Sequence, residues 1–98
     1  MKVKFLVEAQ LELDETINYY NQEVAGLGDS FLREILSTID RIIEFPNSWH
    51  LLSNEIRRCQ TRRFPYGLIY SIIDNELLVL SVSNLHRRPN HWRDRIKE

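Results

Sequence analysis

Residues 67–83, GLIYSIIDNELLVLSVS, decide the fold of this chain. Two apolar runs of strand length flank Asp74-Asn75-Glu76, and turn residues between two such runs predict a β-hairpin. Alternation divides the apolar side chains between two faces, with Ile69, Ile73, Leu78, Leu80 and Val82 on one and Leu68, Tyr70, Ile72, Leu77 and Val79 on the other. Because large apolar surfaces are rarely left in water, we expect both faces to be covered.

Two amphipathic helices are predicted before the hairpin, because apolar residues recur there at spacings of three and four. In the first helix these residues are Ala9, Leu13, Ile17, Tyr20 and Val24, and in the second they are Phe31, Ile35, Ile39 and Ile42. The glycines at positions 26 and 28 are expected to end the first helix. Asp29 or Ser30 is expected to cap the second helix, and Pro46 to end it.

Two further strands complete the predicted sheet. Residues 2–7 alternate between polar and apolar side chains, and residues 56–64 form a strand that Pro65 ends. Residues 46–55 are expected to be a polar connector. The order of strand, two helices and three strands predicts one α+β domain over residues 1–98, in which a helical hairpin packs on an antiparallel sheet.

The composition is that of an ordinary soluble globular protein. Of the 98 residues, 43% are hydrophobic and 28% are charged, and the formal net charge is −1. No apolar run approaches the roughly 18 residues that a membrane helix needs, and no signal peptide is recognisable. Cys59 is the only cysteine, which argues against a disulfide or a cysteine-based metal site. We therefore expect a cytoplasmic protein with no membrane partner, cofactor or metal.

Charge is divided unevenly between the two halves of the chain. Residues 1–55 carry four cationic and ten anionic side chains, whereas residues 56–98 carry nine cationic and four anionic ones. Most of the cations in the second half are arginines, which can bind phosphate or carboxylate through two parallel hydrogen bonds. The basic half predicts an anionic partner, although Arg57, Arg58, Arg62 and Arg63 can equally be solvated surface.

The last basic segment is HRRPNHWRDR, residues 86–95. Trp92 lies among its arginines, and the indole ring could stack on a guanidinium group or on a base. The second face of the hairpin is expected to be covered by this segment acting as a packed anchor, by a partner protein that the segment helps to bind, or by both. The residues expected to contact a target or partner are Arg62, Arg63, Arg87, Arg88, Arg93, Arg95 and Trp92.

Catalysis by the basic segment is chemically possible but weakly indicated. His86 and His91 carry imidazole rings that can transfer protons, and an arginine could stabilise a pentacoordinate phosphate during metal-free RNA cleavage. The spacing of the two histidines implies no fixed geometry, and the sequence has no zinc-protease, phosphate-loop or nucleophile-elbow motif. If the protein is an endoribonuclease, its candidate catalytic residues are His86, Arg87 and Arg63.

Five segments follow one another along the chain: INYYN (17–21), DSFLREI (29–35), FPNSW (45–49), RRFPYGLIYSI (62–72) and SVSNLHRRPNHW (81–92). Each is short, but their order and spacing together resemble the RelE/ParE toxin superfamily of type II toxin–antitoxin modules, which includes plasmid stabilisation proteins. The resemblance implies a RelE/ParE-like α+β fold. It also implies a bacterial growth inhibitor that a cognate antitoxin neutralises.

Members of this superfamily act on different targets. RelE-like members cleave mRNA on the ribosome, and ParE-like members poison DNA gyrase without being nucleases. The nucleases tend to have Arg-Leu-Val-Tyr where this chain has GLIY, so Gly67 replaces an arginine. The ParE-like tail, Val-x-His-x-x-Arg-x-Pro-x-Tyr-Trp, is matched at Val82, Arg87, Pro89 and Trp92, but Asn84 and His91 replace its histidine and tyrosine.

These departures favour a ParE-like toxin that acts on gyrase and is not a nuclease. The alternatives are a ribosome-dependent mRNA endonuclease, in which His86 replaces the lost base, and a family member that has lost toxicity. The match at Arg87, Pro89 and Trp92 implies that these residues fix the end of the chain against the sheet. The other cations of the segment, Arg88, Arg93 and Arg95, are expected to face an anionic partner: the antitoxin's acidic tail, ribosomal RNA or gyrase-bound DNA.

Overall fold

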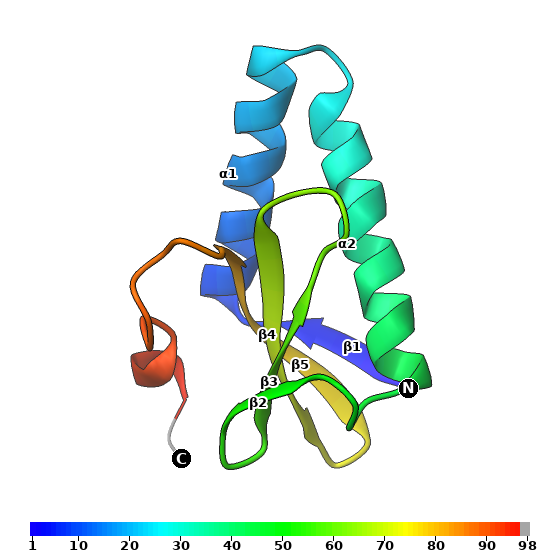
Figure 1. Ribbon diagram of the computed structural model, residues 1–98, viewed down its shortest axis with the longest axis vertical. Coiled ribbons are helices and arrows are strands. Elements are labelled where there is room, and N and C mark those ends of the chain that lie inside the picture. The colour runs from blue at the N-terminus through cyan, green and yellow to red at the C-terminus, as the bar shows by residue number, and fades with distance from the viewer. Residues whose placement is uncertain (97–98) are drawn as a thin grey trace.

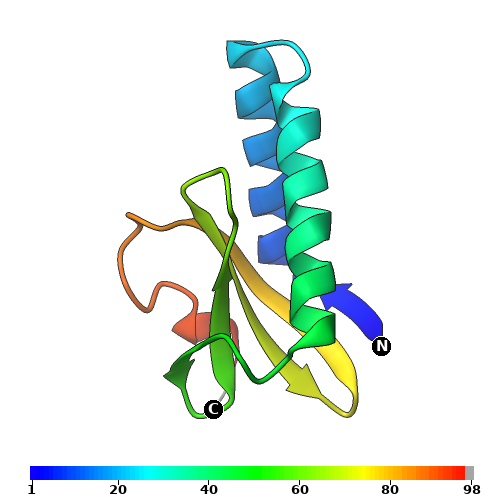
Figure 2. The ribbon, with the colours of Figure 1, turned by 45° about the vertical axis from the view of Figure 1, so that its right-hand side comes forward.

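The computed structural model describes residues 1–96 (Figure 1). The described chain forms five strands, two long helices and a short 3-10 helix. In chain order they are β1 (Lys2–Phe5), α1 (Val7–Glu23), α2 (Leu27–Glu44), β2 (His50–Ser53), β3 (Ile56–Gln60), β4 (Tyr66–Ile73), β5 (Glu76–Asn84) and η1 (Arg93–Arg95). The predicted α+β class is confirmed, with the helical hairpin packed on one face of the sheet (Figure 2).

The five strands form one sheet in the order β1-β5-β4-β3-β2. The last three pairings in this order are antiparallel, as predicted, but β1 runs parallel to β5, with Val3 opposite Leu77 and Phe5 opposite Val79. The predicted antiparallel sheet is therefore corrected to a mixed one. Parallel neighbours need a long connection, and the chain between β1 and β5 supplies it.

Strand β2 occupies part of the segment that was expected to be a polar connector. His50 pairs with Arg58 and Leu51 with Arg57, which makes β2 the edge strand beside β3. The first two residues of β2 are exposed and the last two are half-buried, so no clear alternation marks it as a strand. Residues 50–53 are therefore extended because they pair with the otherwise free edge of β3, and not because of their own side-chain pattern.

The apolar stripes of both helices face the sheet. All four predicted residues of α2 are buried, namely Phe31, Ile35, Ile39 and Ile42. In α1, Ala9 and Leu13 are buried, and Ile17 and Tyr20 pack against the same core. The prediction that Val24 continues this stripe is wrong, because the helix ends one residue earlier and Val24 is 60% exposed.

The start of α2 also differs from the prediction. The helix begins at Leu27, after Gly26 with a φ of 85°, so Asp29 and Ser30 lie inside its first turn rather than at the cap. The cap is supplied from α1, where Asn21 Oδ1 accepts a hydrogen bond of 2.8 Å from the backbone N–H of residue 28. A side chain distant in sequence therefore replaces the local capping residue.

Gly28 lies inside α2 and does not end α1. A β-carbon built at this position would lie 2.1 Å from the carbonyl oxygen of Ile17 and 2.7 Å from Cγ of Asn21. The missing side chain therefore allows the two helices to approach closely. The predicted role of this glycine as a helix stop is corrected to one in helix packing.

The central hairpin has the predicted turn, since Asp74 and Asn75 have positive φ angles of 50° and 60°. A bulge interrupts β5: Ser81 and Val79 pair with consecutive residues of β4, which leaves Leu80 without a pairing partner. The extra residue reverses the alternation beyond it. Val82 therefore belongs to the helix-side core rather than to its predicted face.

The sheet separates two apolar cores. The larger one lies under the helices and contains Leu68, Tyr70, Leu77, Val79 and Val82 together with the helical stripes. The smaller one, on the opposite face, contains Ile56, Ile69, Leu80 and Trp92. Within residues 1–96, neither helix is long and apolar enough to cross a membrane.

Candidate functional site

The C-terminal segment after β5, residues 85–96, is called the tail below. It lies on the sheet face opposite the helices (Figure 2). Trp92 of the tail is 2% exposed and packs with Ile56, Ile69 and Leu80. The sequence predicted that the tail, a partner protein or both would cover this apolar face, and the tail covers it. The apolar face therefore gives no evidence for a partner protein.

Trp92 also stacks on a cation, as its sequence context indicated. The guanidinium carbon of Arg93 lies 4.9 Å from the centroid of the indole ring. This stacking partner comes from the chain itself, and the buried ring is not accessible to a base. Trp92 therefore anchors the tail to the sheet.

Glu12, on α1, joins the first helix to the tail. Its two carboxylate oxygens accept parallel hydrogen bonds of 2.8 Å from the Arg95 guanidinium, and Oε2 also accepts one from Arg87. Oε1 further accepts the Val82 N–H at 3.0 Å and the Ser81 hydroxyl at 3.1 Å. Because the Glu12 side chain is only 14% exposed, this arrangement is a largely buried ionic network.

The environment of Glu12 favours its ionised form. Burial raises the pKa of its carboxyl group, but the hydrogen bond and charge of Arg95 and the bond from the Val82 N–H together hold that pKa below its ordinary value of 4.5. Glu12 is not among the site residues that the sequence predicted. The sequence feature that could have identified it is its position directly before Leu13. A carboxylate beside a buried apolar stripe is partly removed from water, so it needs a cationic partner.

Two of the arginines that were expected to contact a partner, Arg87 and Arg95, instead form ion pairs with Glu12 of the same chain. The Arg95 side chain is 11% exposed, and its Nη1 also donates to the Leu80 carbonyl oxygen at 2.9 Å. The outward-facing role expected for Arg95 is therefore corrected, because Glu12 and Leu80 take its donors. Arg87 remains partly exposed while it binds the same carboxylate, in keeping with its expected role in fixing the tail.

His91, a residue of the tail, contacts two serines of β5. Its Nε2 is 2.9 Å from Ser81 Oγ and 3.1 Å from Ser83 Oγ, and its Nδ1 is 3.0 Å from the Arg88 carbonyl oxygen. Because a carbonyl oxygen can only accept, Nδ1 carries the proton and Nε2 accepts from a serine hydroxyl. Burial lowers the pKa of His91 from its ordinary value of 6.5, against the opposing hydrogen bond to Arg88. The neutral ring thus holds the Arg88 backbone in place.

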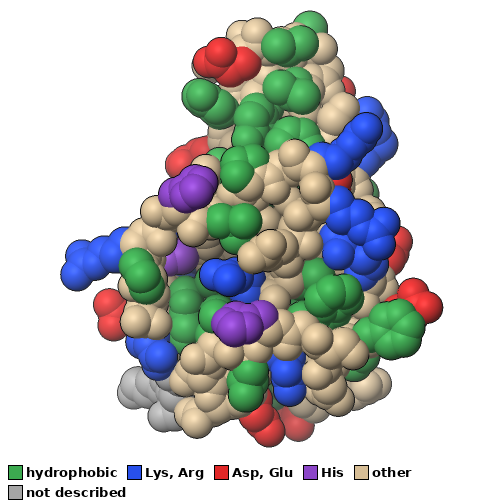
Figure 3. All heavy atoms as spheres, viewed as in Figure 1, with side chains coloured by type: hydrophobic (Ala, Val, Ile, Leu, Met, Phe, Trp, Pro, Cys, Tyr) green, Lys and Arg blue, Asp and Glu red, His purple; other side chains and the backbone are tan. Residues whose placement is uncertain are grey.

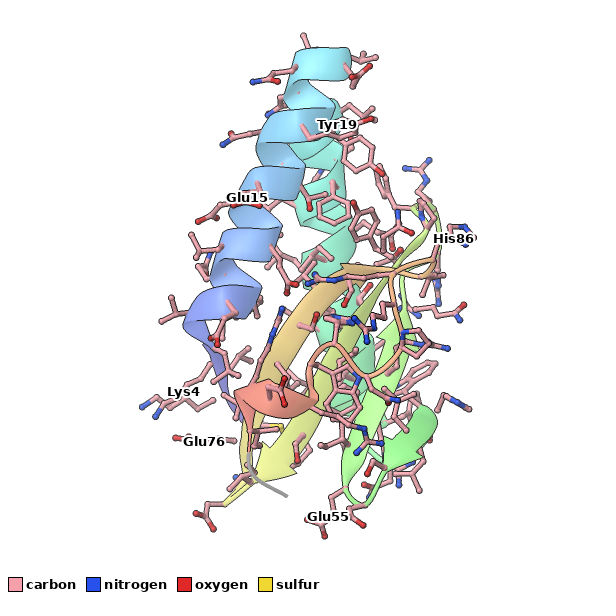
Figure 4. All side chains as sticks on the ribbon, turned by 90° about the vertical axis from the view of Figure 1, so that its left-hand side faces the viewer. Lys4, Glu15, Tyr19, Glu55, Glu76 and His86 are labelled. Carbon is pink, nitrogen blue, oxygen red and sulfur yellow. The ribbon has the colours of Figure 1, made fainter. Side chains whose placement is uncertain are left out.

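The three candidate catalytic residues lie in different surroundings. His86 is exposed and projects from the rim of the tail (Figure 4). Arg63 lies with Arg62 in an open groove of about 390 Å³ beside α2. Arg87 lines a separate pocket under the tail, and His86 lines neither the groove nor this pocket. Neither the groove nor the pocket is therefore lined by all three side chains.

The pocket under the tail has a volume of about 100 Å³ and is called the tail pocket. Figure 3 shows this face of the molecule, where cationic and histidine side chains surround a hollow between the tail and the sheet. The cationic residues that line the pocket are Arg58, Arg87 and Arg88, and the other polar ones are Ser83, Asn84, Asn90 and His91. None of the described lining residues is acidic, so the pocket suits an anion better than a metal ion.

Comparison with solved structures shows that the fold is shared with another protein. A solved structure described as the chromosomal ParDE toxin–antitoxin system from P. aeruginosa is 15% identical in sequence and has a TM-score of 0.73. The match covers 86% of this chain and 95% of the other, and at this identity it shows that the fold is shared. Among curated proteins, no sequence match is found.

The family comparison is more specific. The model described as the ParE toxin of the type II toxin–antitoxin system parDE matches residues 3–90, from β1 into the tail. The resemblance to the RelE/ParE superfamily, with the ParE-like side favoured, is thereby confirmed. With this match over nearly the whole chain, and the shared fold beside it, the protein belongs to the ParE toxin family of type II toxin–antitoxin systems.

Proposed function

We propose that the protein inhibits growth by acting on DNA gyrase, that it does not cleave RNA, and that a cognate antitoxin neutralises it. The observation that carries the proposal is that the three candidate catalytic side chains, His86, Arg87 and Arg63, do not line one common pocket. Cleavage requires a proton acceptor and a cation within hydrogen-bond reach of one phosphate. His86 and Arg63 do not line the pocket that Arg87 lines, and position 67 of the sheet is glycine.

The other histidine near the basic residues also supports a role outside catalysis. Both ring nitrogens of His91 are engaged, Nε2 with the hydroxyls of Ser81 and Ser83 and Nδ1 with the Arg88 carbonyl oxygen. A ring held by three groups of its own chain positions the tail. Its proton-accepting nitrogen points at serine hydroxyls rather than at a ligand.

Exposed apolar side chains support a protein partner such as an antitoxin. Val7 and Leu11 of α1 are 74% and 53% exposed. Residues four apart on a helix share a face, so these two form an apolar strip on the surface of α1. The exposed Arg62, Arg63 and Arg88 suit the acidic tail expected of an antitoxin.

A supercoiling assay with purified DNA gyrase tests the target. The protein should inhibit supercoiling, and the product of the adjacent gene should relieve the inhibition. Replacing two of the exposed arginines together, Arg62→Ala with Arg63→Ala, should weaken inhibition. Lys2→Ala, which removes an exposed cation on β1, serves as the control. Normal supercoiling at a large molar excess of the protein would exclude gyrase as the target.

Primer extension on an mRNA after brief induction in bacteria separates this function from RNA cleavage. No new cuts are expected within the reading frame. Ribosome-dependent cuts that His86→Ala abolishes would replace the proposal with an endonuclease whose base is His86. Unimpaired growth during induction without the adjacent gene would instead identify a family member that has lost toxicity.

A further inference from the structure

We propose that the tail pocket binds a single phosphate group, either free or carried by a nucleotide. This site is a property of the toxin itself and does not depend on gyrase being the target. Three features of the pocket support it: a buried donor without a partner, positive charge that is only partly neutralised, and a wall that the chain holds in place.

The buried donor is Nε of Arg58, which has no hydrogen-bond partner among the described residues. Arg58 lies on β3, opposite Ile69 of β4, and its side chain lines the pocket. Buried N–H groups are nearly always paired, because an unmade hydrogen bond leaves the cost of desolvation uncompensated. A phosphate oxygen in the pocket would accept from Nε, and the neighbouring Nη could donate a second, parallel bond.

The absence of a side chain at Gly67 leaves room for the Arg58 side chain to lie over β4. A β-carbon at position 67 would lie 3.1 Å from Cγ and 3.2 Å from Cδ of Arg58, and 3.3 Å from Cδ2 of Leu85. These contacts are tighter than ordinary packing allows, so a larger residue would displace the arginine or the leucine. The glycine that stands where RelE-like nucleases have an arginine therefore makes room for another arginine from β3.

Positive charge in the pocket is only partly neutralised. Arg87 shares the Glu12 carboxylate with Arg95. In contrast, neither Arg58 nor Arg88 has a carboxylate within ion-pair distance among residues 1–96. Two guanidinium groups without a counter-charge, around a pocket with no acidic lining, favour an oxyanion with several acceptor oxygens.

The wall formed by the tail is held in place, and the space that it encloses is small. His91 fixes the backbone of Arg88 through the hydrogen bond from Nδ1, and buried Trp92 follows directly. A volume of about 100 Å³ suits one tetrahedral phosphate group rather than a whole nucleotide. The nucleoside part of a nucleotide would extend outward past Arg88, which is exposed.

Titration of the full-length protein with inorganic phosphate at constant ionic strength tests the proposal. The Nε–Hε resonance of Arg58 in NMR spectra reports on the pocket, and sodium chloride is the reference salt. Phosphate should shift this resonance saturably, whereas chloride and acetate should not. Adenosine 5′-monophosphate forms a second arm: tighter binding than phosphate identifies a nucleotide as the source of the group, and equal or weaker binding identifies free phosphate.

Two variants assign the binding to Arg58, with affinities measured by calorimetry. Arg58→Gln should weaken phosphate binding about tenfold or more, because it removes the charge and the paired donors. Arg63→Gln removes an arginine outside the pocket and should bind phosphate as the unsubstituted protein does. If circular dichroism shows that Arg58→Gln is unfolded, Arg88→Gln replaces it with the same expectation. Equal shifts with phosphate, chloride and acetate, or equal phosphate affinities of the two arginine variants, would overturn the proposal.

Discussion

At the scale of single residues, Glu12 fixes two arginine side chains of the tail. Its carboxylate holds Arg87 and Arg95 side by side, although two cations so close together would otherwise repel each other. Arginines collected in a short segment are commonly solvated. Here, α1 carries the counter-charge at a position that faces the sheet, so part of the basic segment is drawn inward.

Glu12→Ala should lower the free energy of unfolding by about 3 kcal/mol, because Arg95 would keep its charge in a largely buried position without a partner. Urea unfolding at neutral pH measures this change. The control is Glu15→Ala, which removes an exposed carboxylate from the same helix and should change the free energy by no more than about 0.5 kcal/mol. Equal losses in the two variants would show that the network does not stabilise the fold.

At the scale of elements, the contact between α1 and α2 depends on a residue without a side chain. Gly28→Ala should destabilise the protein by about 1–3 kcal/mol, since the new methyl group would meet the backbone of Ile17, which cannot turn away. Gly26→Asn is the matched control, because no atom lies within 4 Å of its β-carbon position and asparagine tolerates a positive φ. Thermal unfolding of both variants measures the difference. A Gly28→Ala protein as stable as Gly26→Asn would contradict the close approach of the helices.

The tail is a second element whose place depends on one side chain. Trp92→Ala should cost about 3–5 kcal/mol of stability, because it removes a buried ring from the smaller core. It should also increase the binding of an apolar dye, since Ile69 and Leu80 would become accessible. Arg88→Ala should change the stability by no more than about 0.5 kcal/mol, as expected for an exposed residue. Early melting of Arg88→Ala together with normal melting of Trp92→Ala would reverse the two assignments.

At the scale of the whole molecule, Glu12 and His91 make stability depend on pH. The pKa of His91 is lowered from 6.5 in the folded state, so the unfolded chain takes up this proton more readily, and stability should fall as the pH drops below about 6.5. The pKa of Glu12 is lowered from 4.5, so its contribution is present above that pH and is lost as the pH falls through the folded-state value. Acidification should therefore reduce the melting temperature in two stages.

Melting temperatures measured from about pH 8 to pH 3 test this prediction. His91→Gln should flatten the first stage, and Glu12→Gln should flatten the second. The charged groups that face His91 are Arg87, Arg95 and Glu12, and all three remain in the histidine variant. A first stage that persists unchanged in His91→Gln would assign it to another group.

The features that the sequence determined by itself are those that rest on near neighbours. The stripe of α2 and the turn at Asp74-Asn75 follow from side-chain spacing and from local backbone preferences, which act within a few residues. Of the candidate site, the same local patterns identified the basic segment and Trp92 within it, but they left open whether the ring anchors the tail or contacts a partner. These features needed no knowledge of which distant segments meet.

Only the tertiary structure decided which faces and charges come together. Strand β2 is extended because it pairs with the edge of β3, and the bulge at Leu80 places Val82 on the other face of the sheet. In both cases pairing between strands overrides local alternation. Glu12 and Arg95 stand 83 positions apart in the chain, so no local pattern could reveal that one neutralises the other. The tail pocket arises in the same way, since Arg58 and Arg88 approach one anion site only when the tail folds back over the sheet.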